Sequence, residues 1–297
     1  AIGAWSTAAA DTTGVEAHAS LARLLALRRR YTDALAAGRA AVAAGAADPD
    51  AHAALAFALD WSGDHRAGIQ EALVAIEIDS THVPALAVLA EAYATSGNWE
   101  EATRRAQEAV QLDPDSAVAE RALGFVHETL GQTDAALAAY LRAAELAPGW
   151  SAYLVDVGRV HRVRGEVDLA REVLESALEA DPLDPVVHDS LGLLAYDQAE
   201  LEAAAARFGR AIALDPEYAP GHGHLGWTYY SRQRWADAVQ SLERAIELGA
   251  TSPEYLYELG LSYVYLDDCA KGKPLLEQAL AIDPGLAPAK AGLKLCP

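Results

Sequence analysis

Methionine is absent from the 297 residues of this chain, and cysteine occurs only twice. Because the initiator methionine is missing, we expect residue 1 to be either a processed terminus or a cut within a longer protein. No apolar stretch approaches the about 18 uncharged residues that a membrane-spanning helix needs, which excludes such a span in this chain. The hydrophobic fraction of 52% still suits a globular protein with a large core.

Sequence motifs that carry enzyme chemistry are also lacking. We find no glycine-rich phosphate loop, no nucleophile elbow and no paired-cysteine zinc motif. Carboxylates are plentiful, but none forms a converging pair. Most histidines fall at positions typical of packing residues, and the pair His222 and His224 lacks further metal ligands. We therefore expect no enzyme activity, no cofactor and no metal site.

Basic residues are outnumbered: 23 lysines and arginines stand against 43 acidic residues, which gives a net charge of −20. Such a charge repels phosphate backbones, so nucleic acid is excluded as an expected partner. Two interpretations of the acidic surface remain open. It can serve solubility alone, or it can steer a basic partner toward the protein.

An alanine recurs every 34 residues through almost the whole chain. The eight are Ala41, Ala75, Ala109, Ala143, Ala177, Ala211, Ala245 and Ala279. A fixed period of this length indicates an array of identical structural units. With these alanines at position 27, the units are 15–48, 49–82, 83–116, 117–150, 151–184, 185–218, 219–252 and 253–286.

Each unit predicts two amphipathic helices, because apolar positions 3, 7, 10 and 14, and again 20, 24, 27 and 28, recur at helical spacing. Glycine near position 15, as at Gly63, suits a tight turn between them. Proline at position 32, as at Pro114, ends the second helix. Positions 8 and 20 hold only alanine or glycine, so we expect the two helices to cross closely there.

This pattern closely resembles the tetratricopeptide repeat over residues 15–286. The resemblance rests on leucine at position 7, small residues at 8, 20 and 27, a frequent aromatic at 11 and proline at 32. It implies an all-α solenoid, a right-handed superhelix of helical hairpins whose first helices line a concave face. It also implies a protein or peptide ligand bound in that groove.

The family geometry assigns positions 2, 5, 6, 9, 12 and 13 to the concave face. The candidate binding residues at these positions are Phe57, Trp61, Arg121, Phe125, Arg159, Arg162, Tyr196, His224, Trp227, Tyr230, Tyr257 and Tyr265. Tryptophan, tyrosine and arginine are typical binding anchors. The alternative is that these rings pack against neighbouring helices of the protein itself.

The ends of the array are predicted to differ from its middle. Residues 1–14 are expected to be a linker or lead-in. Residues 287–297 are expected to form a capping helix, because Lys294 falls at a helix-crossing position where only a small residue fits. Pro274 lies inside the last second helix, so we expect a kink there or a start delayed to about Lys273.

Cys269 and Cys296 fall at position 17 of the last unit and position 10 of the cap, which should be neighbours. We expect a disulfide that pins the cap to the last unit, the alternative being two buried free thiols. A disulfide would indicate an oxidising compartment, and thus favours an exported protein over a cytoplasmic one.

The sequence favours a non-catalytic interaction scaffold that binds a peptide or partner segment. Two alternatives remain open. The chain can be the repeat portion of a larger enzyme or assembly protein, or its aromatic groove can bind a glycan, because tryptophan and tyrosine also stack on sugar faces.

Overall fold

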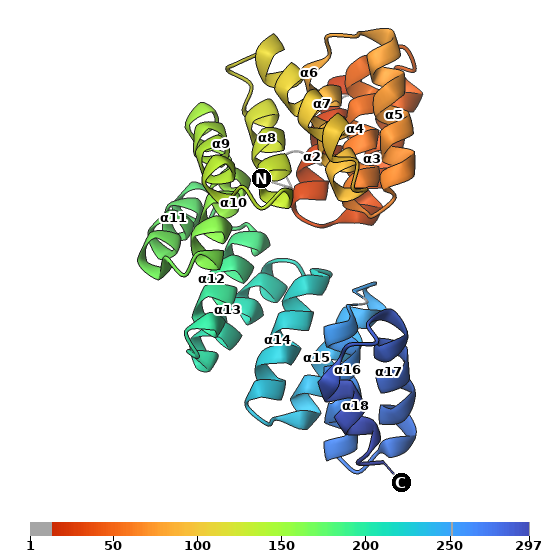
Figure 1. The fold of residues 1–297 in the computed structure, drawn as a ribbon, viewed down its shortest axis with the longest axis vertical. Coiled ribbons are helices and arrows are strands. Elements are labelled where there is room, and N and C mark those ends of the chain that lie inside the picture. Colours follow the sequence, from red (N-terminus) through yellow and green to blue (C-terminus); the bar gives the residue numbers. More distant parts are fainter. Residues whose placement is uncertain (1–13, 251, 297) are drawn as a thin grey trace. The chain divides into compact units, whose positions relative to one another are not determined.

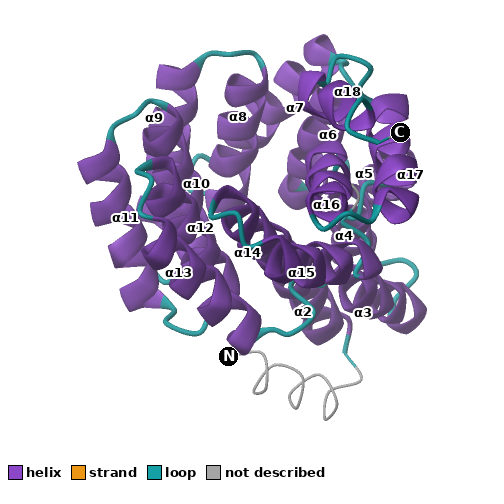
Figure 2. Ribbon diagram, turned by 90° about the horizontal axis from the view of Figure 1, so that it is seen from below, coloured by secondary structure: helices purple, strands orange, loops and turns teal. Residues whose placement is uncertain are grey.

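A computed structural model of the chain describes residues 14–250 and 252–296, so almost all of the expected lead-in, 1–14, lies outside the described residues. The described residues form helices without a strand, grouped in two compact units divided after Leu183. Figure 1 shows the helices of each unit in chain order, and Figure 2 the short loops that join them. The expected all-α solenoid is confirmed.

Unit 1 contains five helical hairpins. Their helices are α2 (Val15–Leu27), α3 (Tyr31–Ala44), α4 (Pro49–Trp61), α5 (His65–Ile78), α6 (Val83–Thr95), α7 (Trp99–Leu112), α8 (Ala117–Thr129), α9 (Thr133–Leu146), α10 (Ser151–Val163) and α11 (Val167–Ala180). Unit 2 contains three hairpins and a short last helix. Its helices are α12 (Pro185–Asp197), α13 (Leu201–Leu214), α14 (Ala219–Ser231), α15 (Trp235–Glu247), α16 (Pro253–Tyr265), α17 (Cys269–Ile282) and α18 (Ala287–Leu293).

Local sequence signals start and end these helices. Asp48 and Asp184 cap α4 and α12 by accepting a backbone N–H, and a proline follows each as the first helical residue. In all eight hairpins the residue at position 15 has positive φ, between 58° and 95°. Glycine fills it four times, but Ala199 and three other non-glycine residues adopt the same left-handed conformation. The turn is therefore set by helix packing even where no glycine is present.

The recurring alanines lie on the second helices, where these pack against first helices of successive hairpins, and all eight are fully buried. Where the two helices of one hairpin cross, residues 16 apart in sequence match each other in volume. In the second and third hairpins both are alanine, as with Ala56 and Ala72. In the last five hairpins the first residue is glycine and the second is large. These pairs are Gly124 with Tyr140, Gly158 with Leu174, Gly192 with Phe208, Gly226 with Leu242, and Gly260 with Leu276. Gly226 and Gly260 also lie close to the backbone of α15 and α17.

Gly192→Ala is expected to destabilise the protein by about 1–3 kcal/mol, because the added Cβ would lie 2.5 Å from the fully buried Phe208 ring. Phe208→Ala alone should cost about 3–5 kcal/mol. The double variant recreates the alanine pair of the second hairpin, so its loss should fall below the sum by at least about 1 kcal/mol. Urea unfolding of the four proteins measures this coupling.

Gly209→Ala is the control in the same hairpin, on α13 next to Phe208, where an added Cβ meets no atom within 4 Å. It should stabilise by about 0.5–1 kcal/mol through helix propensity. Equal effects of Gly192→Ala and Gly209→Ala would contradict the volume match.

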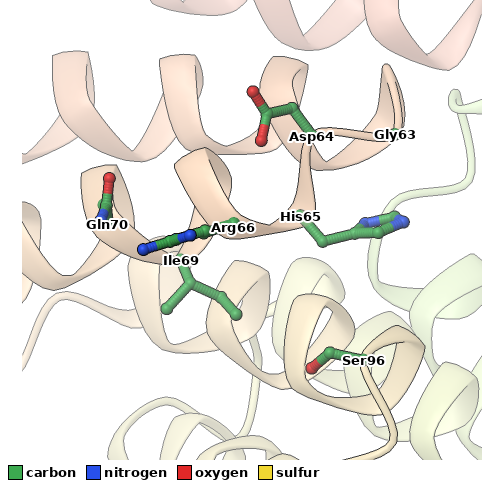
Figure 3. Close-up of a pocket in the computed structure, with 7 residues that line it drawn as sticks. All are labelled: Gly63, Asp64, His65, Arg66, Ile69, Gln70 and Ser96. Atoms are coloured by element: carbon green, nitrogen blue, oxygen red, sulfur yellow. The ribbon is translucent and has the colours of Figure 1, made fainter.

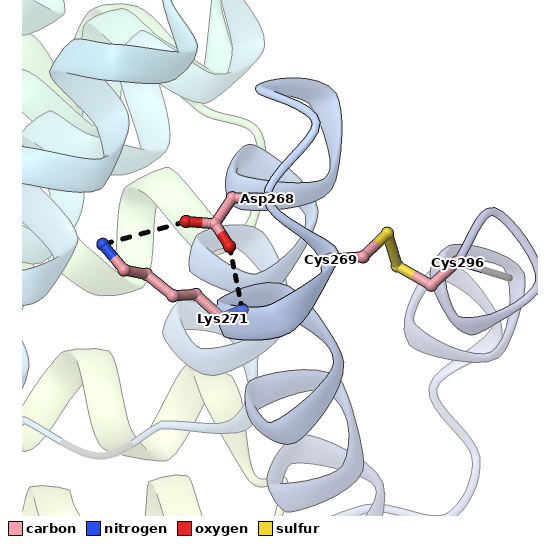
Figure 4. Close-up of a disulfide and its surroundings, with 4 residues drawn as sticks. All are labelled: Asp268, Cys269, Lys271 and Cys296. Carbon is pink, nitrogen blue, oxygen red and sulfur yellow. Dashed lines mark hydrogen bonds and ion pairs between the residues drawn. A yellow bond between two sulfur atoms is a disulfide. The ribbon is translucent and has the colours of Figure 1, made fainter.

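Helix α18 covers the end of unit 2 and is shorter than the expected cap, since it ends at Leu293. Gly292 lies close against Leu261 of α16, where an added Cβ would come within 2.4 Å. Cys296, just beyond the helix, forms a disulfide with Cys269, and their Cα atoms are 5.6 Å apart (Figure 4). The two cysteines therefore attach the cap to the first turn of α17.

The expected delay of the last second helix is wrong, because α17 begins at Cys269 and contains Pro274. Asp268 caps this helix by accepting the backbone N–H of Lys271 at 3.1 Å (Figure 4). The Asp268 side chain and the disulfide of Cys269 stabilise the first turn of α17, which precedes Pro274. Pro274 then removes only one hydrogen bond, the one to the carbonyl of Ala270.

We predict that the unfolded, unreduced protein contains no reactive thiol. Reduction should weaken the attachment of α18 by about 3–4 kcal/mol, because the disulfide closes a loop with a sequence separation of 27. Thiol titration in denaturant tests the bond, and hydrogen exchange in α18 tests its effect. Two reactive thiols per chain would contradict the prediction.

Candidate functional site

The first helices of unit 1 carry a buried ion network centred on Arg121 of α8. Its guanidinium donates to Glu91 of α6 and to Asp156 of α10, both at 2.8 Å. The Arg121 side chain is only 7% exposed, and both carboxylates are buried as well. Burial raises the pKa of Glu91, opposed by the charge of Arg121. The Arg121 side chain is therefore paired inside unit 1.

The other residues that the sequence assigned to this face surround the network. Trp61 lies under the Arg121 guanidinium at 4.9 Å and contacts the buried ring of Phe57 at 5.2 Å. Arg159 pairs with Glu128 and with Asp156, and it remains 34% exposed. Phe125 packs against two apolar clusters of the core. Arg162 is half-buried.

The two ends of unit 1 also contact each other. Arg28, in the turn between α2 and α3, is 5% exposed and pairs with Asp181, which follows α11. Contacts within unit 1 therefore occupy most of the charged and aromatic side chains of its first helices. This leaves little of the expected binding surface open in unit 1.

A shallow cavity of about 510 Å³ lies elsewhere in unit 1, at the turn between α4 and α5 (Figure 3). Its lining residues are Gly63, Asp64, His65, Arg66, Ile69, Gln70 and Ser96. His65 is held by Asp60 at 2.7 Å. None of the residues that the sequence assigned to binding lies in this cavity.

In unit 2 the assigned aromatic residues come together. We define the aromatic row as Tyr196 of α12, Trp227 and Tyr230 of α14, Trp235 of α15, and Tyr257 and Tyr265 of α16. Five of these side chains are half-buried, and Tyr265 is 45% exposed.

Ring contacts connect much of the aromatic row. Tyr196 stacks on Trp227 with centroids 5.4 Å apart, and its hydroxyl lies 2.7 Å from Ser231 Oγ. At the other end Trp235 contacts Tyr230 at 5.3 Å and Tyr265 at 4.5 Å. These contacts hold the rings in place before any ligand arrives, which lowers the entropy cost of binding.

His224 supports the row from α14. Its ring stacks on Trp227 at 5.9 Å, and its Nδ1 lies 2.7 Å from a carboxylate oxygen of Asp189. Asp189 is 4% exposed, so this pair orients the imidazole from the interior of unit 2. His224 therefore helps to fix the Trp227 ring.

Glu258 of α16 lies beneath the row and is 2% exposed. The Trp227 indole lies near its carboxylate and opposes the rise of its pKa, and the Tyr257 hydroxyl lies 3.4 Å from Oε1. Oε2 is buried without a hydrogen-bond partner among the described residues. Burial raises the pKa of Glu258 to about 8.

Neither Glu258 nor Trp235 is among the residues that the sequence assigned to binding. Glu258 occupies position 6, an inner position, but acidic residues were treated as solvated surface. The sequence signal for Glu258 was its place directly after Tyr257, which the repeat pattern assigns to the inner face. Trp235 begins a second helix, which the family pattern places away from the groove, so only packing reveals its contact with Tyr265.

The described residues offer no group of three or more potential metal ligands. Among them, no helix is long and apolar enough to cross a membrane. Unit 2 thus combines partly exposed aromatic rings with the buried carboxylate of Glu258.

Known proteins resemble this chain in family and in fold. Residues 88–150 and 190–253 match the family model described as the tetratricopeptide repeat. No curated protein sequence matches the chain.

Three solved structures illustrate the fold, and each is less than 25% identical in sequence. The APC/C hetero-tetramer Cut9–Hcn1 aligns with a TM-score of 0.75 and 21% identity over 94% of this chain, which spans 55% of that protein's length. Pseudomonas aeruginosa PilF aligns at 0.59 and 20% identity over 75% of this chain and 97% of its own. Human IFIT1, a dimer with m7Gppp-AAAA, aligns at 0.68 and 14% identity over 95% and 80%.

The family match covers parts of both units, and the hairpins continue between and beyond the matched residues. Similar solved structures contain the same arrangement of successive helical pairs. Residues 88–150 and 190–253 thus match the tetratricopeptide repeat, and the chain shares the fold of solved structures built from successive helical pairs.

Proposed function

We propose that the protein is a non-catalytic scaffold that binds an extended peptide segment of a partner protein on the aromatic row of unit 2. The observation that carries the proposal is the row itself, with six aromatic residues on four helices and most rings partly open to solvent. Large aromatic side chains left open at a surface are typical of binding anchors. The tetratricopeptide fold suggests protein–protein interaction, which agrees with this role.

Charge favours a basic ligand. The chain carries a net charge of −20, and a carboxylate lies beneath the row. This charge argues against nucleic acid and would speed the approach of a basic segment. A larger protein that contains this chain would use unit 2 in the same way, to recruit a partner.

Trp227→Ala is expected to weaken peptide binding at least about tenfold, because it removes a ring that contacts both Tyr196 and His224. The assay is titration of immobilised peptide arrays and oligosaccharide arrays with labelled protein. The matched control is Trp99→Ala, which removes a 45% exposed tryptophan from α7 in unit 1.

The proposal is supported if peptide spots bind wild type and Trp99→Ala but do not bind Trp227→Ala. Signal on oligosaccharides alone would replace it with the glycan alternative. Equal binding by all three proteins would place the binding surface elsewhere.

A further inference from the structure

Glu258 differs from the other buried carboxylates of the first helices. Asp60 faces His65, Glu91 and Asp156 face Arg121, and Asp189 faces His224. Each of those acids thus has an arginine or a histidine beside it. Glu258 instead lies near the neutral side chains of Trp227 and Tyr257, and the charged group that acts on it among the described residues is another acid, Glu254.

A buried carboxylate without a cation is costly, and an unpaired carboxylate oxygen adds to that cost. In Glu258 that oxygen is Oε2. The rings over it belong to the proposed binding surface, and Tyr257 and Tyr230 each lie close enough to interact electrostatically with the carboxylate. The site therefore lacks one component that a ligand can supply, a positive charge with a hydrogen-bond donor.

We propose that Glu258, Trp227, Tyr230 and Tyr257 form a pocket for one lysine side chain of the bound peptide. The ammonium group would pair with Oε2 after a shift of the half-buried tyrosine rings, and the rings would contact it through their π faces. This inference rests on the proposed function and specifies which partner the row selects.

Lysine fits this site better than arginine. Oε1 already lies near the Tyr257 hydroxyl, so the carboxylate has one oxygen to offer rather than two. A guanidinium binds a carboxylate best through both oxygens, whereas an ammonium group acts as a point charge and needs only one. The row also surrounds the carboxylate with rings, which favours a compact cation on a flexible apolar stem.

The pocket makes binding dependent on pH. The ionisable groups that act on Glu258 are Glu254 and Tyr257 from its own helix and Tyr230 from α14. Since the pKa of Glu258 is raised to about 8, it carries a proton at neutral pH and must release it to pair with lysine. Affinity for a lysine peptide should therefore rise from pH 6 to about pH 8, while lysine itself stays charged.

The test begins with selection from a random linear peptide library displayed on phage, using wild type, Glu258→Gln and the control Glu254→Gln. Wild type and the control should enrich peptides with lysine at one fixed position, and Glu258→Gln should not. A selected peptide is then synthesised with lysine and with norleucine, its uncharged counterpart. Affinities are measured by calorimetry at pH 6 and pH 8.

We expect lysine to improve the wild-type affinity at least about tenfold over norleucine at pH 8, and by less at pH 6. Glu258→Gln should bind both peptides alike at both pH values, which also shows that it is folded. Enriched peptides without a fixed lysine, or with a lysine advantage kept in Glu258→Gln, would overturn the pocket and leave the proposed function standing. Failure of wild type to enrich any peptide would overturn both.

Discussion

Replacing Arg121 with methionine is expected to lower the free energy of unfolding of unit 1 by about 3–5 kcal/mol at pH 7. The change leaves the buried carboxylates of Glu91 and Asp156 without their shared cation. Such a loss is much larger than the net value of an intact ion pair, because a charge in a low-dielectric interior is left uncompensated. Urea unfolding, with hydrogen exchange in α6 and α8 to assign the change to unit 1, measures it.

Arg159→Met is the matched control, because Arg159 also contacts Asp156 but is 34% exposed. Solvent screening should limit its loss to about 1 kcal/mol or less. Adding Glu91→Gln and Asp156→Asn to Arg121→Met should restore part of the stability, since it removes the uncompensated charges. Similar losses for Arg121→Met and Arg159→Met would show that the buried network is not the reason for the effect.

The Arg121→Met loss should also depend on pH. Burial raises the pKa of Glu91 and of Asp60 even in the wild type, and Arg121 opposes both shifts. Without Arg121 these pKa values rise further, so both acids keep their protons to a higher pH in the folded state than in the unfolded state. Stability is then lost as pH rises, and the variant should be closer to wild type at pH 5 than at pH 8.

Glu258→Gln is expected to stabilise unit 2 by a few kcal/mol at pH 8, on the order of 1.36 kcal/mol per unit of removed pKa shift. In the unfolded chain Glu258 ionises near 4.5, whereas in the folded protein its pKa is about 8. Between these values the folded state binds the extra proton, so wild-type stability falls as pH rises through this range. Glutamine does not ionise and removes that slope.

Thermal or urea unfolding of wild type and Glu258→Gln across pH 5 to pH 8 measures the difference, with hydrogen exchange in α14 and α16 to locate it. The two proteins should be similar at pH 5 and diverge as pH rises. Glu254→Gln, one turn earlier on the same helix, should keep most of the wild-type slope, because burial is the largest cause of the raised Glu258 pKa and Glu254 adds less to it. Parallel profiles for wild type and Glu258→Gln would show that the carboxylate is not destabilising in the folded protein.

The two acid environments have opposite consequences for function. Around Arg121 the protein supplies its own cation, so removing a partner damages the fold. Around Glu258 the described residues supply no such cation, and removing the acid should strengthen the fold while weakening lysine binding. A residue that lowers stability at its site is typical of a functional position.

The sequence was sufficient for the repeat, the hairpins and the small residues at the helix crossings. Those features follow from local periodicity, and the fully buried alanines at position 27 show how directly spacing translates into packing. The neighbouring positions of Cys269 and Cys296 followed from the same frame. The continuous second helix through Pro274 did not, because capping and the disulfide outweigh the local preference against proline.

Only the tertiary structure separated the candidate binding residues that are buried and paired from those that lie at a partly open surface. Position in the repeat made Arg121 and Trp227 equivalent, since both lie on first helices. Contacts between residues far apart in sequence separated them. Asp156 and Glu91 enclose Arg121 from two neighbouring helices, whereas Trp227 lies at a partly open surface.

What the sequence by itself determined is therefore the architecture, because a 34-residue period repeats the same local packing instruction along the chain. Only the tertiary structure decided which side chains of the inner face are paired within the protein and which stay open to a ligand. That choice depends on the charge and volume of side chains one or more hairpins away. Glu258 illustrates this, because only its neighbours in the folded protein, Trp227 of α14 among them, show that the groups acting on it are neutral side chains and another acid.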